Sequence, residues 1–266
     1  MNQFCNKTKI ALAVAALAVS VGAHAVPIGA VTIAGGACQT WLPSNGFAAG
    51  QACDAPNLAA ALSGDGNVEL SKFGGPVTTM TGSIAGDTII MSSLVLSDWM
   101  ANGNALATSY IMSAYAAAGQ PLNAGQLTAL TGLFLSTPQG YGRLSDPNVS
   151  SVETSANGTI YVGLDGFDDA SPVLNALAAA INGMNLPGID PIPFVAPGAQ
   201  ASEVVKVQVN GASWQYLYGF SATPTGYQSP DGSFSGLYSL QVPEPESLAL
   251  LGIGLLGLCL GRRRRG

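Results

Sequence analysis

The chain has 266 residues and few charged side chains, with nine Lys or Arg, 15 Asp or Glu and one histidine. Between Val26 and Gln241 there are three basic residues against 13 acidic ones, a net charge of −10. This stretch has no basic patch to neutralise phosphates, which excludes a nucleic-acid-binding surface of the usual kind. The single histidine, His24, lies outside it, which excludes histidine-dependent catalytic triads and histidine-ligated metal sites there.

The N-terminus has the three parts of a secretory signal peptide. Lys7 and Lys9 form a positive region, residues 10–21 are apolar, and residues 23–25 are a small-x-small cleavage site. The apolar run is shorter than the roughly 20 residues that a membrane-spanning helix needs. We therefore predict that signal peptidase cuts after Ala25 and that the chain is exported.

The exported stretch contains two of the four cysteines, Cys38 and Cys53. Exported proteins fold in an oxidising compartment, so we predict a disulfide between these two residues. It would close a loop of about 15 residues and contribute roughly 3 kcal/mol in the chain-entropy model. The alternative is a pair of free buried thiols.

Turn residues and hydrophobic periodicity divide the first half of the exported stretch into elements. Residues 102–104, Asn-Gly-Asn, should interrupt one helix because Asn and Gly favour left-handed backbone conformations. The predicted elements are short strands and loops over 26–75, strands over 77–84 and 88–96, a helix start capped by Ser97-Asp98, and helices over 105–118 and 124–136.

The second half begins with a predicted strand over 159–164, followed by a helix that Ser171 caps and that ends at residues 182–183. Asn210-Gly211 then predicts a two-residue hairpin turn. It joins a strand over 203–209, which alternates valines with polar residues, to a strand over 213–220, which alternates aromatic residues. A last strand covers 234–241. The fold class is therefore α+β, with a mostly antiparallel sheet and about three helices.

The aromatic row Trp214, Tyr216, Tyr218 and Phe220 has two interpretations. Aromatic faces can stack on sugar rings, which would make this strand a carbohydrate-binding surface. A period-2 aromatic row is also typical of the buried face of a strand, and the all-valine partner strand favours this second interpretation.

The three carboxylates Asp165, Asp168 and Asp169 follow a predicted strand and could bind Ca²⁺, which prefers oxygen ligands. Their spacing does not match an EF-hand loop, and Asp168 and Asp169 also suit the start of the following helix. Whether they bind calcium stays open. Pairs of carboxylates can hydrolyse glycosidic bonds, but the sequence does not identify such a pair.

The C-terminus ends in three consecutive parts. Val242, Pro243, Glu244 and Pro245 are followed by an apolar run over 247–261 and then by Arg262, Arg263, Arg264 and Arg265. The prolines prevent the apolar helix from extending backward, and arginines beside a membrane span stay on the cytoplasmic side. We predict a short transmembrane helix with the exported domain on the other side of the membrane.

This three-part order resembles the PEP-CTERM sorting tail of Gram-negative bacteria, the substrate signal of the membrane protease exosortase. The same tail also ends some proteins labelled as ice-binding. The resemblance covers about 25 residues and implies a transient inner-membrane anchor, processing by exosortase, and transfer to the outer surface or the exopolysaccharide matrix. It implies nothing about the fold of the exported domain.

The predicted organisation is a signal peptide over 1–25, an exported α+β domain over 26–241 and a sorting tail over 242–266. The function expected from it is that of a non-catalytic surface or exopolysaccharide-matrix protein without a cofactor. Its expected partners are signal peptidase, exosortase, the inner membrane before processing, and exopolysaccharide. The alternatives are a carbohydrate-binding module and, third, a carboxylate-dependent glycan hydrolase.

Overall fold

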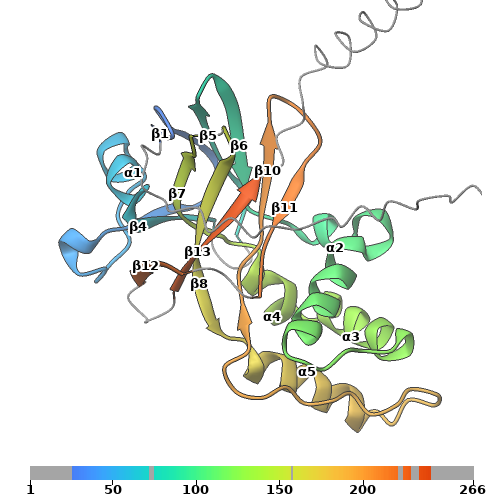
Figure 1. Ribbon diagram of the computed structural model, residues 1–266. Coiled ribbons are helices and arrows are strands. Elements are labelled where there is room, and N and C mark those ends of the chain that lie inside the picture. Colours follow the sequence, from blue (N-terminus) through green and yellow to red (C-terminus); the bar gives the residue numbers. More distant parts are fainter. Residues whose placement is uncertain (1–25, 72–74, 157, 221–223, 229–233, 241–266) are drawn as a thin grey trace, which may run out of the picture.

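The computed structural model describes residues 26–71, 75–156, 158–220, 224–228 and 234–240, and these residues form an α+β fold (Figure 1). The strands make two antiparallel sheets, and helices α2–α5 lie together at one side of them. The predicted fold class is confirmed. The two sheets replace the single sheet that the strand pattern suggested.

The larger sheet is built around β8, which pairs with β7 on one side and β13 on the other. The short strand β1 pairs with the end of β7, and β9 pairs with the end of β8. In spatial order the main strands are β12 (Pro224–Gln228), β13 (Phe234–Leu240), β8 (Ile160–Asp169), β7 (Asn148–Thr154), β4 (Ser63–Leu70) and β3 (Cys38–Trp41), with β1 (Val26–Pro27) and β9 (Gln200–Ala201) beside them.

The smaller sheet contains two hairpins, one made by the predicted strands over 77–84 and 88–96 and one at the predicted Asn210-Gly211 turn. Residues 85 and 86 make the first turn, with positive φ at both Ala85 and Gly86. Its strands in spatial order are β11 (Gln215–Leu217), β10 (Val205–Val209), β6 (Asp87–Ser92), β5 (Thr78–Ile84) and β2 (Thr32–Gly35).

Most helices lie where the sequence placed them, and α3 has the predicted bounds. Asn123 caps it by accepting from the backbone N–H of Gln126 at 2.9 Å. The helix bounds are α1 (Ala55–Ala61), α2 (Leu96–Ala117), α3 (Ala124–Ser136), α4 (Pro138–Tyr141) and α5 (Ser171–Gly183), with 3-10 turns at Pro43–Asn45 and Gly142–Leu144.

The predicted break in α2 is also confirmed. Asn102, Gly103 and Asn104 all have positive φ, so the helix is interrupted over one left-handed stretch and then resumes. The cap differs slightly from the prediction, because the helix begins at Leu96. The carboxylate of Asp98 accepts from the backbone N–H of Val95 at 2.9 Å, which satisfies a donor at the helix start.

Further details of local structure differ from the sequence prediction. The segment 26–75 contains a regular helix, α1, and an eight-residue strand, β4, rather than only short strands and loops. At α5 the cap is not Ser171, because the carboxylate of Asp169 accepts from the Ser171 N–H at 2.9 Å. At the starts of α1 and α5, the carboxylates of Asp54 and Asp169 accept hydrogen bonds from the first free backbone N–H groups of the helix.

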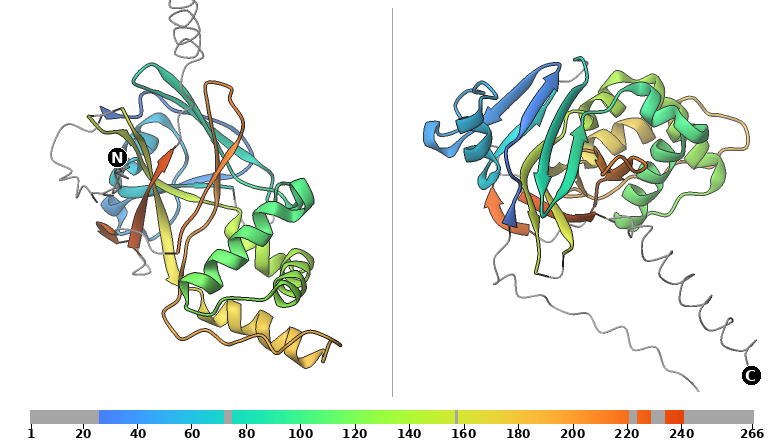
Figure 2. Two further views of the ribbon diagram at one scale, coloured as in Figure 1. Left: turned by 45° about the vertical axis from the view of Figure 1, so that its right-hand side comes forward. Right: turned by 90° about the horizontal axis from the view of Figure 1, so that it is seen from above.

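Two hydrophobic cores hold the fold together. One lies between the sheets, where valines and leucines of the larger sheet meet methionines and isoleucines of the smaller one. The second lies among α2, α3 and α5 and contains Trp99, Tyr110 and Phe134. Viewed from above, the strands lie on one side and α2–α5 on the other (Figure 2).

The β10–β11 hairpin contributes to both cores because of its register. Asn210 and Gly211 have φ of 51° and 73°, as the predicted turn requires. The strands nevertheless pair Val207 with Gln215 and Lys206 with Tyr216, one residue away from a two-residue hairpin. A one-residue shift moves alternate side chains to the opposite face. The valines therefore pack between the sheets, while the aromatic residues pack against the helices.

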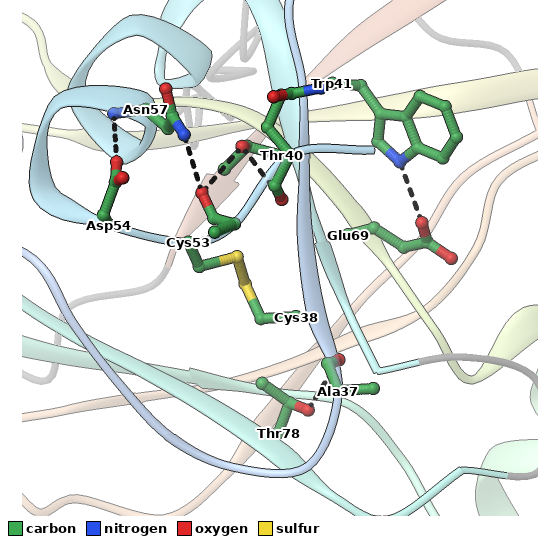
Figure 3. The surroundings of a disulfide bond; sticks show 11 residues. Ala37, Cys38, Thr40, Trp41, Cys53, Asp54, Asn57, Glu69 and Thr78 are labelled. Carbon is green, nitrogen blue, oxygen red and sulfur yellow. Dashed lines mark hydrogen bonds between the residues drawn. A yellow bond between two sulfur atoms is a disulfide. The ribbon is translucent and has the colours of Figure 1, made fainter. Parts of the chain in front are cut away.

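The predicted disulfide between Cys38 and Cys53 is present, with Cα atoms 6.0 Å apart. It joins Cys38 on β3 to Cys53, which directly precedes Asp54, the N-cap residue of α1 (Figure 3). Thr40 pairs with Gln51 across the same loop, so the disulfide reinforces an existing contact. Because β3 is an edge strand of the larger sheet, the loop lies along that edge.

We expect replacement of both cysteines by serine to lower the free energy of unfolding of the 26–241 domain by about 3 kcal/mol, because the disulfide restricts the unfolded chain. Urea unfolding of the oxidised protein and of the double variant measures the difference. An equal midpoint and slope for the two proteins would contradict a stabilising role.

Candidate functional site

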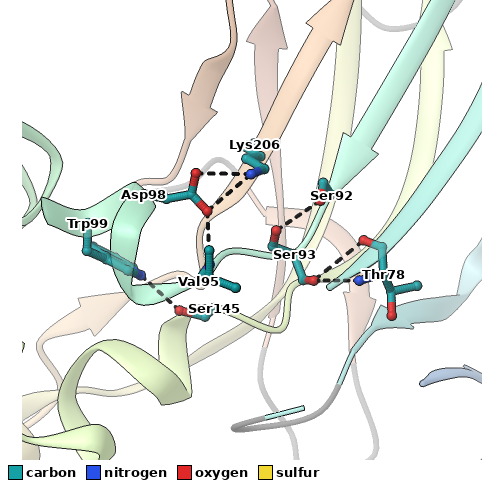
Figure 4. Close-up of polar contacts among 8 residues, drawn as sticks. All are labelled: Thr78, Ser92, Ser93, Val95, Asp98, Trp99, Ser145 and Lys206. Atoms are coloured by element: carbon teal, nitrogen blue, oxygen red, sulfur yellow. Dashed lines mark hydrogen bonds and ion pairs between the residues drawn. The ribbon is translucent and has the colours of Figure 1, made fainter. Parts of the chain in front are cut away.

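The helical layer is fastened to the smaller sheet by a partly buried ion pair (Figure 4). Lys206 on β10 contacts both carboxylate oxygens of Asp98 in the first turn of α2, at 3.0 and 3.1 Å. The next residue, Trp99, donates to the hydroxyl of Ser145 at 2.9 Å. These contacts fix where α2 begins and therefore where its inward face lies.

That inward face forms one wall of a cavity of about 270 Å³. Helix α2 supplies Tyr110 and Tyr115, α3 supplies Phe134, and α5 supplies Leu174 and Leu177. Polar side chains at the cavity are Arg143, Asp169 and Glu203. A mostly apolar cavity with a few convergent polar groups is the usual form of a small-molecule site.

Tyr110 is the centre of the aromatic wall. Its ring centroid lies 5.2 Å from that of Tyr218 and 4.9 Å from that of Phe220. Its hydroxyl donates to the backbone carbonyl of Ser202 at 2.8 Å. Burial, together with the negative charge of nearby Glu203, raises its pKa well above 10, so the phenol stays neutral.

Glu203 is the polar group with the most unusual environment. Burial is the main cause that raises its pKa well above 4.5, and the negative charges of Asp146 and Glu69 add to the effect. Asn148 acts in the opposite direction by hydrogen bonding. The backbone N–H of Asn148 donates to Oε2 of Glu203 at 2.8 Å. The side-chain amide of Asn148 donates to Oε2 at 3.1 Å and to Oε1 at 3.3 Å.

Asp169 is the contrasting carboxylate of the cavity. Hydrogen bonds from Ser171 are the main cause that lowers its pKa, so it is ionised at neutral pH. Two carboxylates with pKa values displaced in opposite directions are the usual setting for acid–base chemistry. Here each carboxylate already accepts hydrogen bonds from the protein, Asp169 at the start of α5 and Glu203 from Asn148. The walls suit a small apolar molecule better than a hydroxyl-rich glycan.

The aromatic row predicted from the sequence does not form one exposed platform. Trp214 is 40% exposed, and the Lys206 ammonium lies 5.2 Å from the centre of its ring. Tyr216, Tyr218 and Phe220 pack against the helical core, and burial raises the pKa of both tyrosines. The aromatic row is therefore largely a packing surface, and only Trp214 at its end is exposed enough to contact a ligand.

The acidic residues after the predicted strand lie on β8 itself rather than on a loop. Asp165 is buried and accepts from the side-chain amide of Asn67 at 3.0 Å, whereas Asp169 is exposed at the far end of the strand. Four residues of a strand separate these two carboxylates by about 13 Å. Among the residues that the structure describes, no group of three His, Cys, Asp or Glu side chains is placed to hold a metal ion.

Neither the cavity nor the role of Glu203 could be recognised from the sequence. The hydrogen-bond partner of Glu203, Asn148, is 55 residues away, and Tyr110 is further still along the chain. The sequence predicts the helices over 105–118 and 124–136 that contain Tyr110 and Phe134, but it does not predict a cavity between them. Only the packing of three separate helices brings these side chains together.

The sorting motif, the signal peptide and the apolar C-terminal run lie outside the described residues. Residues 241–265 match the PEP-CTERM protein-sorting motif. The chain is thus an exported protein of the kind that exosortase sorts, with a transient membrane anchor in a Gram-negative bacterium. No curated protein and no solved structure matches the chain. Within the described ranges, no helix is long and apolar enough to span a membrane.

Glu203 should make stability depend on pH in a defined direction. Because its folded pKa lies above its unfolded value of 4.5, the native state holds more protons, and stability falls as pH rises above about 4.5. Between the unfolded and folded pKa values of Glu203, we expect the free energy of unfolding of Glu203→Gln to rise relative to that of the unmodified protein. The expected rise is about 1.4 kcal/mol for each pH unit in this range.

Urea unfolding of the domain between pH 4 and pH 8 tests this expectation. The matched control is Glu153→Gln, a partly buried glutamate on β7. A Glu203→Gln variant whose stability relative to the unmodified protein does not rise with pH would contradict the burial argument.

Proposed function

We propose that residues 26–241 act as a non-catalytic protein of the outer cell surface or the exopolysaccharide matrix. The observation that carries the proposal is the sorting motif at residues 241–265, which marks an exported chain for release from its membrane anchor. The motif begins directly after β13, so processing would release the whole α+β domain. Signal peptidase would remove the N-terminal 25 residues before that step.

The chemistry of the domain supports a role without catalysis. Its sequence has no histidine between residues 26 and 241, and its two cysteines are joined as a disulfide. Glu203 has a raised pKa but is engaged by Asn148. A net charge of −10 and a disulfide favour solubility and resistance to unfolding outside the cell.

A second candidate function is weak carbohydrate binding at Trp214. The specific observation is an exposed indole beside the Lys206 ammonium. With Tyr216 and Tyr218 packed against the helices, the contact would be one ring wide. A glycan hydrolase is third, because Asp169 and Glu203 line a largely apolar cavity of about 270 Å³ rather than an open cleft.

The sorting role predicts a clear effect of the tail. We expect Pro243→Ala combined with Glu244→Ala to leave the full-length protein in the inner membrane, because exosortase would no longer recognise the Pro-Glu-Pro segment. Membrane fractionation and the mass of the mature C-terminus measure the outcome. Glu246→Ala, just outside the Val-Pro-Glu-Pro segment, serves as the control. Unchanged release of the double variant would mean that the tail is only an anchor.

The proposal also predicts that the purified domain does not turn over glycans or peptides. Weak binding of the host polysaccharide is compatible with it and should decrease in Trp214→Ala but not in Phe194→Ala, which removes another exposed aromatic side chain. Product analysis after incubation with a glycan panel is the measurement. Turnover that disappears in Glu203→Gln or Asp169→Asn would replace the proposal by the hydrolase alternative.

A further inference from the structure

The two ends of the exported domain lie in one row of the larger sheet. Val26 on β1 pairs with Thr154 on β7, Thr154 pairs with Ile160 on β8, and Ile160 pairs with Leu240 on β13. Neighbouring strands are about 4.8 Å apart, so three spacings place Val26 and Leu240 about 14 Å from each other. Figure 1 shows β1 and the tip of β13 on the same side of the fold, away from α3 and α5.

The chain that follows Leu240 is too short to let the domain turn freely. The apolar run begins at Ser247, seven residues further on. Seven residues span at most about 25 Å when fully extended. A domain of this length has a radius of gyration of about 17 Å and is therefore more than about 40 Å across. The connection is shorter than the domain, so the end that contains Leu240 must stay near the bilayer.

The other end of β8 lies far from this row. From Ile160 to Asp169 the strand covers nine steps, or about 30 Å. Asp169 starts α5 and lines the cavity. The helical layer and its cavity are thus displaced by most of the length of the domain from the point where the chain enters the membrane.

The row ends in a small, uncharged turn. Residues 155–159 join β7 to β8, and the backbone N–H of Ser155 donates to the carbonyl of Thr159 at 2.9 Å. The described residues of this turn are Ser, Ala, Gly and Thr. In a domain with a net charge of −10, a turn without acids can approach lipid headgroups without the repulsion that acidic surfaces meet at anionic lipids.

We propose that the end of the larger sheet formed by Val26, the 155–159 turn and Leu240 faces the inner-membrane surface in the anchored precursor. Helices α2–α5 and their cavity then point away from the bilayer and are open to the periplasm before processing. The proposal rests on the membrane anchor that the sorting motif implies, and it does not depend on the final location or activity of the domain.

The test places a bimane fluorophore at one of two exposed alanines, Ala156 in the turn or Ala180 on α5. The chain from Val26 to Gly266, which lacks the signal peptide and its Cys5, carries Ala156→Cys or Ala180→Cys and is reconstituted in phosphatidylglycerol–phosphatidylethanolamine vesicles that contain a lipid with a nitroxide on its headgroup. Cys259→Ser in both proteins removes the thiol of the apolar run, and the Cys38–Cys53 disulfide does not react with the label.

We expect strong quenching at residue 156 and little at residue 180. Equal quenching, or stronger quenching at 180, would overturn the orientation. Quenching at neither position would overturn the anchoring on which it rests. The same labelled chains ending at Gln241 should lose the quenching, and quenching that persists without the tail would show adsorption of the domain rather than orientation by its anchor. Detection of a matrix or glycan activity leaves each of these outcomes unaffected.

Discussion

The register of β8 in the larger sheet is the constraint on which the other features depend. At one end, Ile160 lies opposite Thr154 and Leu240, which sets the row where both chain ends leave the fold. At the other end, Asp169 accepts from the Ser171 N–H and starts α5. A slip of one residue would reverse the faces of the strand and expose its core side chains. One strand thus fixes the core, the chain exits and the position of the helical layer.

The proposed surface or matrix function rests on this arrangement more than on any reactive group. A precursor with a signal peptide and a membrane anchor, as we propose here, must fold while both of its ends are held at one membrane. Chain ends in a single row allow this without strain across the domain. The cavity lies beyond the far end of β8, so its apolar walls are remote from the processing site. Anchoring and any later binding event can therefore proceed independently.

Local signals in the sequence located the three longer helices and two of the turns. The bounds of α3, the left-handed stretch at residues 102–104 and the Asn210-Gly211 turn all depend on neighbouring residues, and all are as predicted. The hairpin register was not predictable, because one extra residue after the turn transfers the aromatic row from the valine side to the helical side. The cavity and the Glu203–Asn148 contact depend on packing between distant segments, for which a single sequence carries no signal.

The placement of the two ends of the exported domain side by side is the central claim. Pro27, Glu153, Tyr161 and Ser239 are opposite one another on four adjacent strands, and Pro27 and Ser239 are both exposed. Dipolar broadening in electron paramagnetic resonance, with nitroxides at Pro27→Cys and Ser239→Cys in the 26–241 domain, measures their separation. Ends in one row predict strong broadening from a backbone separation of about 14 Å. An unbroadened spectrum, as expected for ends about 30 Å apart at opposite ends of β8, would contradict this placement.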